Sequence, residues 1–379
     1  MNANRDQKDC LLKIIDAGIN SRTYPLDISN EDAKLYKQIA CKQNILPVLW
    51  NGFRITNSFN AYEELVEPEL SKIRYQFILR DHSLTQIKEA LNKADIPYIP
   101  LKGSVIRDLY PEPWFRTCND IDVLVPEERL DEAVKTLEDN TDFKYWKKSY
   151  HDVSMLNSDV HLELHFSIRV HMNDSNELLD RVWDYSKPSG EGSCYVMSPE
   201  FLMFHVVAHM ARHLINGGLG FRPYIDLWLL KTKTEFDEAA LRSMLGSCNL
   251  LQFYENSCHL VDVWFAGAEH NDTTRKLEDL CFQGGVFGNS QIQTSANYRN
   301  FKGLGYLARR FFYPINDLKD SNYSDGGNAR LVSSTQLKRW KTLLERDTQK
   351  RILQEIKTTF SRDEKEVNEF AGLMKDLGL

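Results

Sequence analysis

Short apolar or alternating runs occur in one part of this 379-residue chain, between about Ile96 and Phe166. Runs of this length, bounded by turn-forming residues, predict β-strands. Five such strands are predicted, at Ile96–Leu101, Ile121–Val125, Phe143–Tyr150, His151–Leu156 and Val160–Phe166. Residues 157–159, Asn-Ser-Asp, favour a hairpin between the last two strands. Helices are predicted from Gly103 to about Tyr110 and from Pro126 to Asn140, so the sheet is small and interleaved with helices.

The rest of the chain has helical periodicity. From Asp9 to about Lys93, apolar residues recur every three or four positions, with breaks near residues 21–25 and 57–60. Ser198-Pro-Glu predicts a helix start that follows a linker at residues 189–193, and this helix should stop at residues 216–218. Irregular segments are expected at 284–300 and 316–328. The prediction is an α+β fold with an N-terminal helical region (1–93), an α/β core with a small mixed sheet (94–188) and a C-terminal helical domain (189–379).

Composition narrows the function classes. The chain has 47 Lys and Arg against 54 Asp and Glu, and a net charge of −7 disfavours a protein that coats nucleic acid. The seven cysteines are odd in number and form no C-x-x-C pair, so neither a disulfide framework nor a zinc knuckle is indicated. The N-terminus lacks an apolar run of signal-peptide type. We therefore expect a cytoplasmic protein.

Two predicted strands carry acidic residues in a pattern that suits metal chemistry. In Asp120-Ile-Asp-Val-Leu-Val, the two carboxylates point to one face of the strand and the apolar residues to the other. Alternation likewise places His161, Glu163 and His165 on one face of the return strand. Taken alone, the Asp120-Ile-Asp motif could instead be a solvated loop. The His161–Phe166 segment alone could be an ordinary amphipathic strand. However, carboxylates beside a core strand are costly without cations or donors nearby.

The segment Lys102-Gly103-Ser104 joins a strand to a helix. Backbone N–H groups at such a junction can seat a phosphate, and glycine allows its close approach. Taken alone, Gly-Ser after a strand more often marks a tight turn.

Together these motifs resemble the nucleotidyltransferase superfamily of DNA polymerase β type. More closely, they resemble the bacterial family of uncharacterised nucleotidyltransferases. The resemblance is carried by Leu101-Lys-Gly, Tyr110-Pro, Arg116, Asp120-Ile-Asp-Val-Leu-Val, His209-x-x-x-His213 and Arg222-x-x-x-Asp226.

The resemblance implies a metal-dependent enzyme that transfers a nucleoside monophosphate from an NTP, usually ATP, to an acceptor, with loss of pyrophosphate. Asp120 and Asp122 would bridge two Mg²⁺ or Mn²⁺ ions, and Glu163 would complete the nucleophile-side ion and accept a proton. Gly103 and Ser104 would hold the triphosphate, with Lys102 or Arg116 offsetting its charge.

The acceptor stays open, and a small molecule or a protein is favoured over bulk nucleic acid. Two other functions are also open. One is a module that binds nucleotide without turnover, and the other is a toxin-type transferase that modifies tRNA.

Further residues have competing interpretations. His205, His209 and His213 repeat every four residues, and a cleft-lining helix face is favoured over a zinc site because no H-E-x-x-H motif is present. Arg222 and Asp226 are spaced to form a structural brace, although Arg222 could instead reach a phosphate. His165 could touch the metal water or the acceptor. The basic and aromatic segments at residues 309–313 and 338–357 suggest either RNA contact or, preferably, amphipathic packing.

Overall fold

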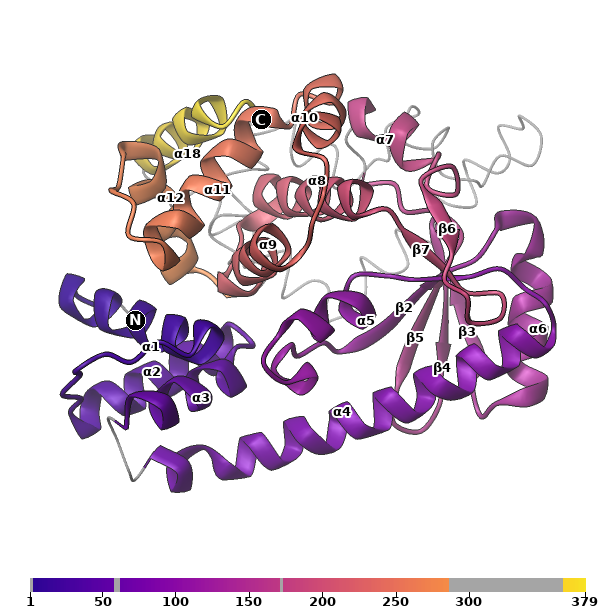
Figure 1. The fold of residues 1–379 in the computed structure, drawn as a ribbon, viewed down its shortest axis with the longest axis horizontal. Helices are drawn as coiled ribbons and strands as arrows, with labels where there is room; N and C mark the ends of the chain where they lie inside the picture. The colour runs from indigo at the N-terminus through magenta and orange to yellow at the C-terminus, as the bar shows by residue number, and fades with distance from the viewer. Residues whose placement is uncertain (1–2, 58–61, 171–172, 286–363) are drawn as a thin grey trace.

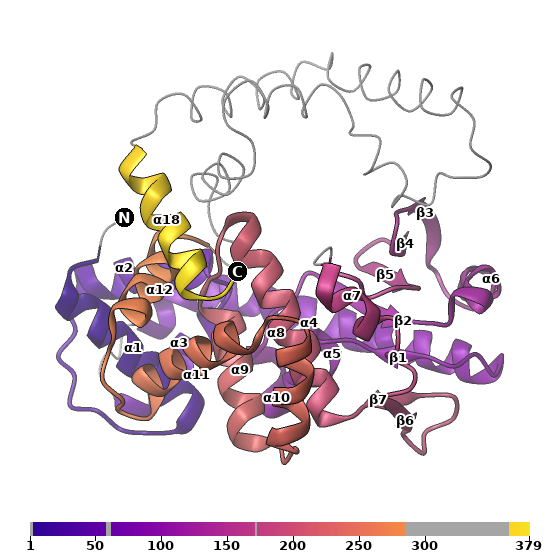
Figure 2. The same ribbon diagram turned by 90° about the horizontal axis from the view of Figure 1, so that it is seen from above.

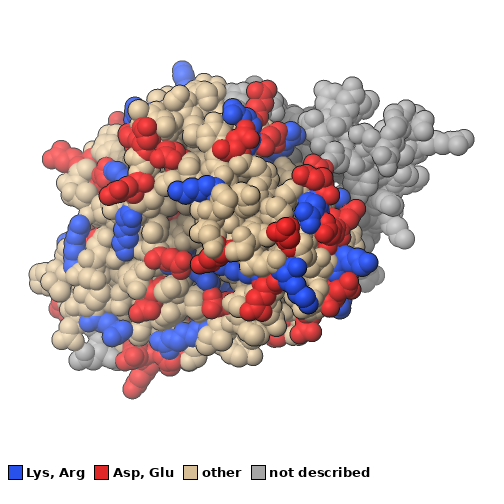
Figure 3. All heavy atoms as spheres, turned by 45° about the vertical axis from the view of Figure 1, so that its right-hand side comes forward, with Lys and Arg blue, Asp and Glu red and all other residues tan. Residues whose placement is uncertain are grey.

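The computed structural model describes residues 3–57, 62–170, 173–285 and 364–379. The segments 309–313 and 338–357, the stretch 316–328 and most of 284–300 lie outside the described residues. The chain folds into a helical body and a smaller body built on a β-sheet, which lie side by side (Figure 1). None of the described helices is sufficiently long and apolar to cross a membrane. Acidic and basic side chains are interspersed on the face that Figure 3 shows.

The N-terminal half of the described chain contains the elements α1 (Arg5–Asn20), α2 (Asn30–Lys42), α3 (Leu46–Thr56), α4 (Tyr62–Lys93), β1 (Ile99–Pro100), α5 (Gly103–Ile106), β2 (Asp120–Leu124), α6 (Leu130–Asn140), β3 (Lys144–Lys148), β4 (Asp152–Leu156) and β5 (His161–His165). Short 3-10 turns cover Arg107–Leu109, Pro113–Phe115 and Glu127–Arg129. Then follow α7 (Asn173–Leu179), β6 (Ser186–Pro188), β7 (Tyr195–Met197), α8 (Pro199–Gly217), α9 (Phe221–Lys233), α10 (Glu238–Ser247), α11 (Leu251–Phe265), α12 (Asp272–Gln283) and α18 (Glu364–Asp376).

The main sheet is mixed, with strand order β1-β2-β5-β4-β3. Strands β2 and β5 are parallel, while the other neighbouring pairs are antiparallel. The five predicted strands are confirmed, and β4 and β5 form the predicted hairpin. One face of the sheet packs its apolar residues against α4 and α6, and the polar residues of β2 and β5 point to the other face. The structure combines helices with a small mixed sheet, which is compatible with the predicted α+β class.

The helices before and after the sheet share one hydrophobic core, which includes Leu11 of α1, Val48 of α3 and Val261 of α11. The second core lies under the sheet and includes Ile121, Leu162 and residues of α6. Two segments that are distant in the sequence therefore build the helical body, as Figure 2 also shows from above.

Helix α4 contributes to both cores. Its first part buries Tyr62 and Leu70 in the helical core, and its last part buries Ile87 in the sheet core. Between them, Tyr75 and Ile78 are 57% and 62% exposed. The helix therefore links the two bodies along its whole length (Figure 1).

The start of α8 is capped as predicted. The side chain of Ser198 accepts a hydrogen bond from the Phe201 N–H, and the helix ends at Gly217. The linker predicted at residues 189–193 is wrong, because this segment is the turn between β6 and β7. The carbonyl of Ser193 accepts a hydrogen bond from the Tyr98 N–H, and its own N–H donates to Asn92. These bonds fasten the turn to the segment that precedes β1.

Candidate active site

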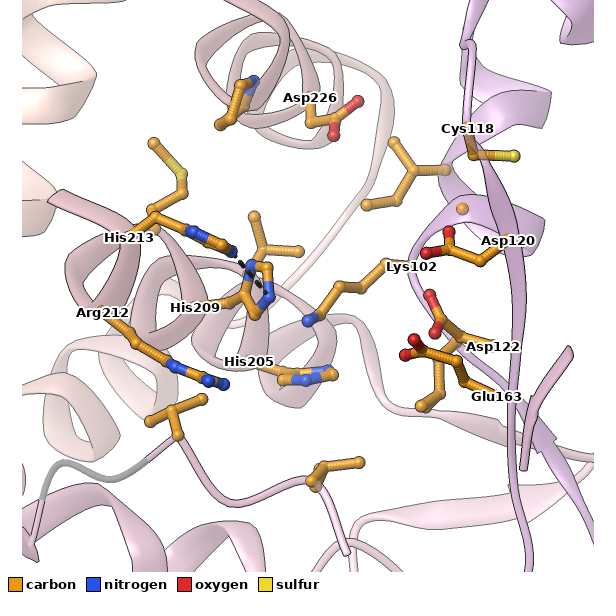
Figure 4. Close-up of a pocket in the computed structure, with 18 of the residues that line it drawn as sticks. Lys102, Cys118, Asp120, Asp122, Glu163, His205, His209, Arg212, His213 and Asp226 are labelled. Carbon is orange, nitrogen blue, oxygen red and sulfur yellow. Dashed lines mark hydrogen bonds between the residues drawn. The ribbon is translucent and has the colours of Figure 1, made fainter. Parts of the chain in front are cut away.

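A cavity of about 350 Å³ opens between the polar face of the sheet and the helices α8 and α9 (Figure 4). Every site residue predicted from the sequence lines it except Ser104. The predicted residues in the lining are Lys102, Gly103, Arg116, Asp120, Asp122, Glu163, His165, His209, His213, Arg222 and Asp226. The backbone N–H of Ser104 donates to the carbonyl of Leu101, which closes the turn after β1.

Parallel pairing of β2 and β5 brings the acidic residues together. Asp122 lies opposite Glu163, and Asp120 lies opposite His161. Directly paired residues point to the same face of a sheet, so the three carboxylates share the cavity side of the sheet. Figure 4 shows them one below another on the same side of the cavity.

His165 completes this row. Its Nε2 lies 3.0 Å from Oδ1 of Asp122 and 3.6 Å from Oε2 of Glu163. One ligand atom from each of these three residues lies within 4.8 Å of the others, and they form the one cluster of metal-ligating side chains in the described part of the chain. Asp120 is not part of that cluster. Among the described residues, neither Asp122 nor Glu163 forms an ion pair with arginine or lysine.

Burial and neighbouring charges shift the pKa values of the side chains in this row. Burial favours the neutral form of His165, but hydrogen bonds with Asp122 and Glu163 outweigh it and raise the pKa of His165 to about 9. Burial also opposes ionisation of Asp122, yet the His165 contact and the charge of Lys102 lower its pKa to about 2. Among the described residues, no side chain forms a hydrogen bond with Asp120. Its burial and the charges of Asp122 and Glu163 raise the pKa of Asp120 to about 6, and the charges of Arg222 and His161 only partly offset these effects.

Cations and imidazoles from other elements face the carboxylates. Figure 4 shows Lys102 extending into the space between the carboxylates and His205 and His209 of α8. Burial lowers the pKa of Lys102 to about 7, although Asp122 opposes this shift. Arg212 donates a 3.4 Å hydrogen bond to the hydroxyl of Tyr150. Within the described residues, no carboxylate lies at ion-pair distance from Lys102 or Arg212, so both cations remain available to an anionic ligand.

The imidazoles of α8 are neutral. Burial and the charge of Lys102 hold the pKa values of His205 and His209 well below the usual range, and lower that of His213 to about 4. The Nε2 atoms of His209 and His213 are 3.2 Å apart. In the described part of the chain these histidines belong to no cluster of metal-ligating side chains. They line the cavity, which is the role that their helical spacing favoured.

A buried ion pair fastens α9 to the segment before β2. Arg116 donates from Nε and Nη2 to the two carboxylate oxygens of Asp226, at 2.9 and 2.8 Å, and the Tyr110 hydroxyl donates to Oδ1 at 2.7 Å. The side chains of Arg116 and Asp226 are each 7% exposed. The sequence spacing paired Asp226 with Arg222, but in the structure the bidentate partner of Asp226 is Arg116. Arg222 donates to the carbonyl of Thr117.

The cavity also contains residues that the sequence interpretation did not single out. Arg212 is one, and its signal was available, because it lies three residues after His209 on the same helical face. His151, which precedes β4, and Arg169, which follows β5, are two more. Nothing in their local sequence distinguishes them from surface residues, since their placement depends on how the β4–β5 hairpin meets α8.

A cavity that sets converging carboxylates against unpaired cations is typical of enzymes that act on phosphoryl groups. The family model described as "Uncharacterised nucleotidyltransferase" matches residues 29–266. The chain belongs to this family, which makes it a transferase that acts on a nucleotide. The match runs from the N-terminal helices through the sheet to α11. No curated protein and no solved structure matches the chain.

Proposed function

We propose that this protein transfers a nucleoside monophosphate from an NTP, with ATP as the first candidate, to a hydroxyl group of an acceptor. The observation that carries the proposal is the pairing of Asp122 with Glu163 on parallel strands, with Asp120 beside them and unpaired cations opposite. The resemblance of the motifs to nucleotidyltransferases of DNA polymerase β type supports it. The acidic balance of the chain favours a small molecule or protein in the cytoplasm as acceptor.

The donor set fits divalent ions. Carboxylate oxygens are the ligands that Mg²⁺ and Mn²⁺ take, and Asp120, Asp122 and Glu163 supply them on one side of the cavity. Such ions, when bound, would neutralise phosphate oxygens and assist an in-line displacement.

The residues of the chain then have separate tasks. Glu163 accepts the proton of the acceptor hydroxyl while the oxygen of that hydroxyl forms a bond to the α-phosphorus of the NTP. The bond from that phosphorus to the β-bridging oxygen breaks, and pyrophosphate leaves. Lys102 and Arg212 hold phosphate oxygens through charge-assisted hydrogen bonds.

Gly103 and Arg116 shape the phosphate side of the cavity. A Cβ at Gly103 would lie 3.1 Å from Nη1 of Arg116, so glycine keeps this corner open. Because Nε and Nη2 of Arg116 bind Asp226, a nucleotide phosphate would contact this guanidinium through Nη1.

Labelled ATP tests the proposal. The protein is incubated with [α-³²P]ATP, Mg²⁺ and acceptor pools of small hydroxylated molecules, proteins or tRNA, and pyrophosphate release and label transfer are measured. We expect both with one pool, and a loss of at least about 100-fold in the Asp120→Ala, Asp122→Ala double variant. The matched control is Asp131→Ala with Asp139→Ala, which removes the same charge from α6 outside the cavity.

Unchanged turnover in the double variant of the cavity would refute the proposal. ATP binding without label transfer to any pool would instead favour the non-catalytic module. Label transfer to tRNA alone, with growth arrest on expression that Glu163→Ala relieves, would favour the toxin-type transferase.

A further inference from the structure

His165 lies where a ligand to a metal ion would lie. It follows Glu163 by two residues on β5, so both side chains point to the cavity, and its backbone pairs with Leu124, two residues after Asp122. The imidazole therefore reaches back toward both carboxylates from the far end of the row. The Nε2 distances of 3.0 and 3.6 Å match the separation of about 3–4.3 Å between ligands that are each about 2.0–2.2 Å from one ion.

The groups around Asp122 and Glu163 favour a bound metal ion, rather than a further protein side chain, as the partner of these carboxylates. Asp122 and Glu163 line the cavity, and within the described residues the group that pairs with both is His165 itself. Its Nδ1 is buried, with no hydrogen-bond partner in the described residues. The Nε2 atom, in contrast, is directed at the two carboxylates. An ion shared with these carboxylates would therefore be bound through Nε2.

We propose that His165 is a ligand: its Nε2 and the carboxylates of Asp122 and Glu163 form a site for one divalent ion that prefers Mn²⁺ or Co²⁺ to Mg²⁺. Magnesium binds oxygen ligands and retains its waters, whereas imidazole nitrogen suits later first-row metals. A set with one nitrogen and two carboxylates therefore shifts the preference away from Mg²⁺. This inference rests on the proposed function, and it concerns metal binding before any nucleotide is present.

The alternative is that His165 only positions Asp122 as a positively charged hydrogen-bond partner. The two roles predict opposite effects when His165 is removed. A ligand contributes affinity, so its loss weakens metal binding. A cationic partner competes with the ion for the same carboxylates, so its loss leaves metal binding unchanged or strengthens it.

Titration of the full-length protein with Mn²⁺ separates these roles, with the free ion followed by EPR and no nucleotide added. We expect His165→Gln to weaken Mn²⁺ binding by about 10-fold or more and to reduce the preference for Mn²⁺ over Mg²⁺. The matched control is His161→Gln, on the same face of the same strand but next to Asp120, and it should change Mn²⁺ affinity by less than about threefold. Asp120→Asn should also weaken Mn²⁺ binding less than His165→Gln does, because Asp120 lies outside the cluster.

A second measurement needs no variant. Pulsed EPR of Mn²⁺ bound to the unaltered protein should show coupling to an imidazole ¹⁴N nucleus. Absence of nitrogen coupling, or equal or tighter Mn²⁺ binding in His165→Gln, overturns the proposal. Neither readout depends on catalysis. A failure of this inference, seen in metal binding, is therefore distinguishable from a failure of the proposed reaction, seen in nucleotidyl transfer.

Discussion

The two walls of the cavity are built in different ways. The sheet wall carries Asp120, Asp122 and Glu163, whose positions follow from the hydrogen-bond register of β2 and β5. The helical wall carries imidazoles and Arg212 on α8, whose positions follow from packing between elements distant in sequence. The sheet wall is acidic, whereas the helical wall is neutral or cationic. The comparison suggests that the sheet wall provides the chemistry and the helical wall binds and orients.

The strongest test of this division compares Glu163→Gln with Arg212→Gln. Loss of Glu163, the proposed base and metal ligand, should lower kcat by about 10²–10⁴-fold with little change in KM for ATP when the metal ion is saturating. Loss of Arg212 should mainly raise KM for ATP, because it removes a phosphate contact without altering the base. Steady-state pyrophosphate release measures both. A similar fall in kcat for the two variants would show that the walls do not divide the work in this way.

The attachment of the helical wall can be broken at the Arg116–Asp226 pair. Arg116→Ala leaves a buried carboxylate whose remaining donor among the described residues is the Tyr110 hydroxyl, which should lower the free energy of unfolding by about 3–5 kcal/mol. Urea denaturation followed by circular dichroism measures this change. The exposed pair Arg129–Glu132 provides the control, and Arg129→Ala should cost far less, because water and salt screen an exposed pair. Equal costs would mean that the buried pair does not brace α9.

The sheet wall should carry a stability cost at neutral and alkaline pH. The pKa of Asp120 is raised to about 6, so its ionisation opposes folding. This cost is absent below the unfolded pKa of about 4 and complete above about 6. Asp120→Asn should therefore stabilise the metal-free protein by about 2 kcal/mol at pH 8 and have little effect at pH 4, as measured by urea denaturation in a chelator. The prediction fails if the gain is the same at both values of pH.

The helical wall should respond to acid in the opposite sense. The pKa of His213 is lowered to about 4, so the folded protein holds it neutral. The stability that this contributes is complete above the unfolded pKa of about 6.5 and is lost as the pH falls toward 4. His213→Asn should reduce the loss of stability between pH 7 and 4 by about 1 kcal/mol, whereas a substitution of exposed His82 should not. Parallel stability curves for His213→Asn and the unaltered protein would contradict this expectation.

The sheet wall was largely predictable from the sequence, because alternation fixes which residues share a face. Alternation placed Asp122 and Glu163 each on the polar face of its own strand, and the parallel register of the structure sets them opposite each other. The partner of Asp226 was not predictable in the same way. Local spacing offered Arg222, four residues earlier, but Arg116 is separated from Asp226 by more than a hundred positions and reaches it only when α9 docks.

Two further differences between the sequence-based expectations and the structure have similar causes. The turn at residues 189–193 has the composition of a linker, and only its hydrogen bonds to Asn92 and Tyr98 distinguish it from one. The contact of His165 with both carboxylates depends on a side-chain rotamer that alternation does not specify. Sequence periodicity therefore predicts which side chains share a face of a strand or helix. The packing of distant elements and the side-chain rotamers decide which residues each of them contacts.

Helix α4 imposes a constraint on the length of the chain. Each residue of an α-helix turns the following segment by about 100° and advances it by about 1.5 Å. Because the two ends of α4 are anchored in different cores, one inserted residue near Tyr75 would rotate the carboxylate row away from α8. An insertion of seven residues would nearly restore the rotation but add about 10 Å of separation. Changes of side chain should therefore be tolerated at the exposed middle of this helix, and changes of length should not.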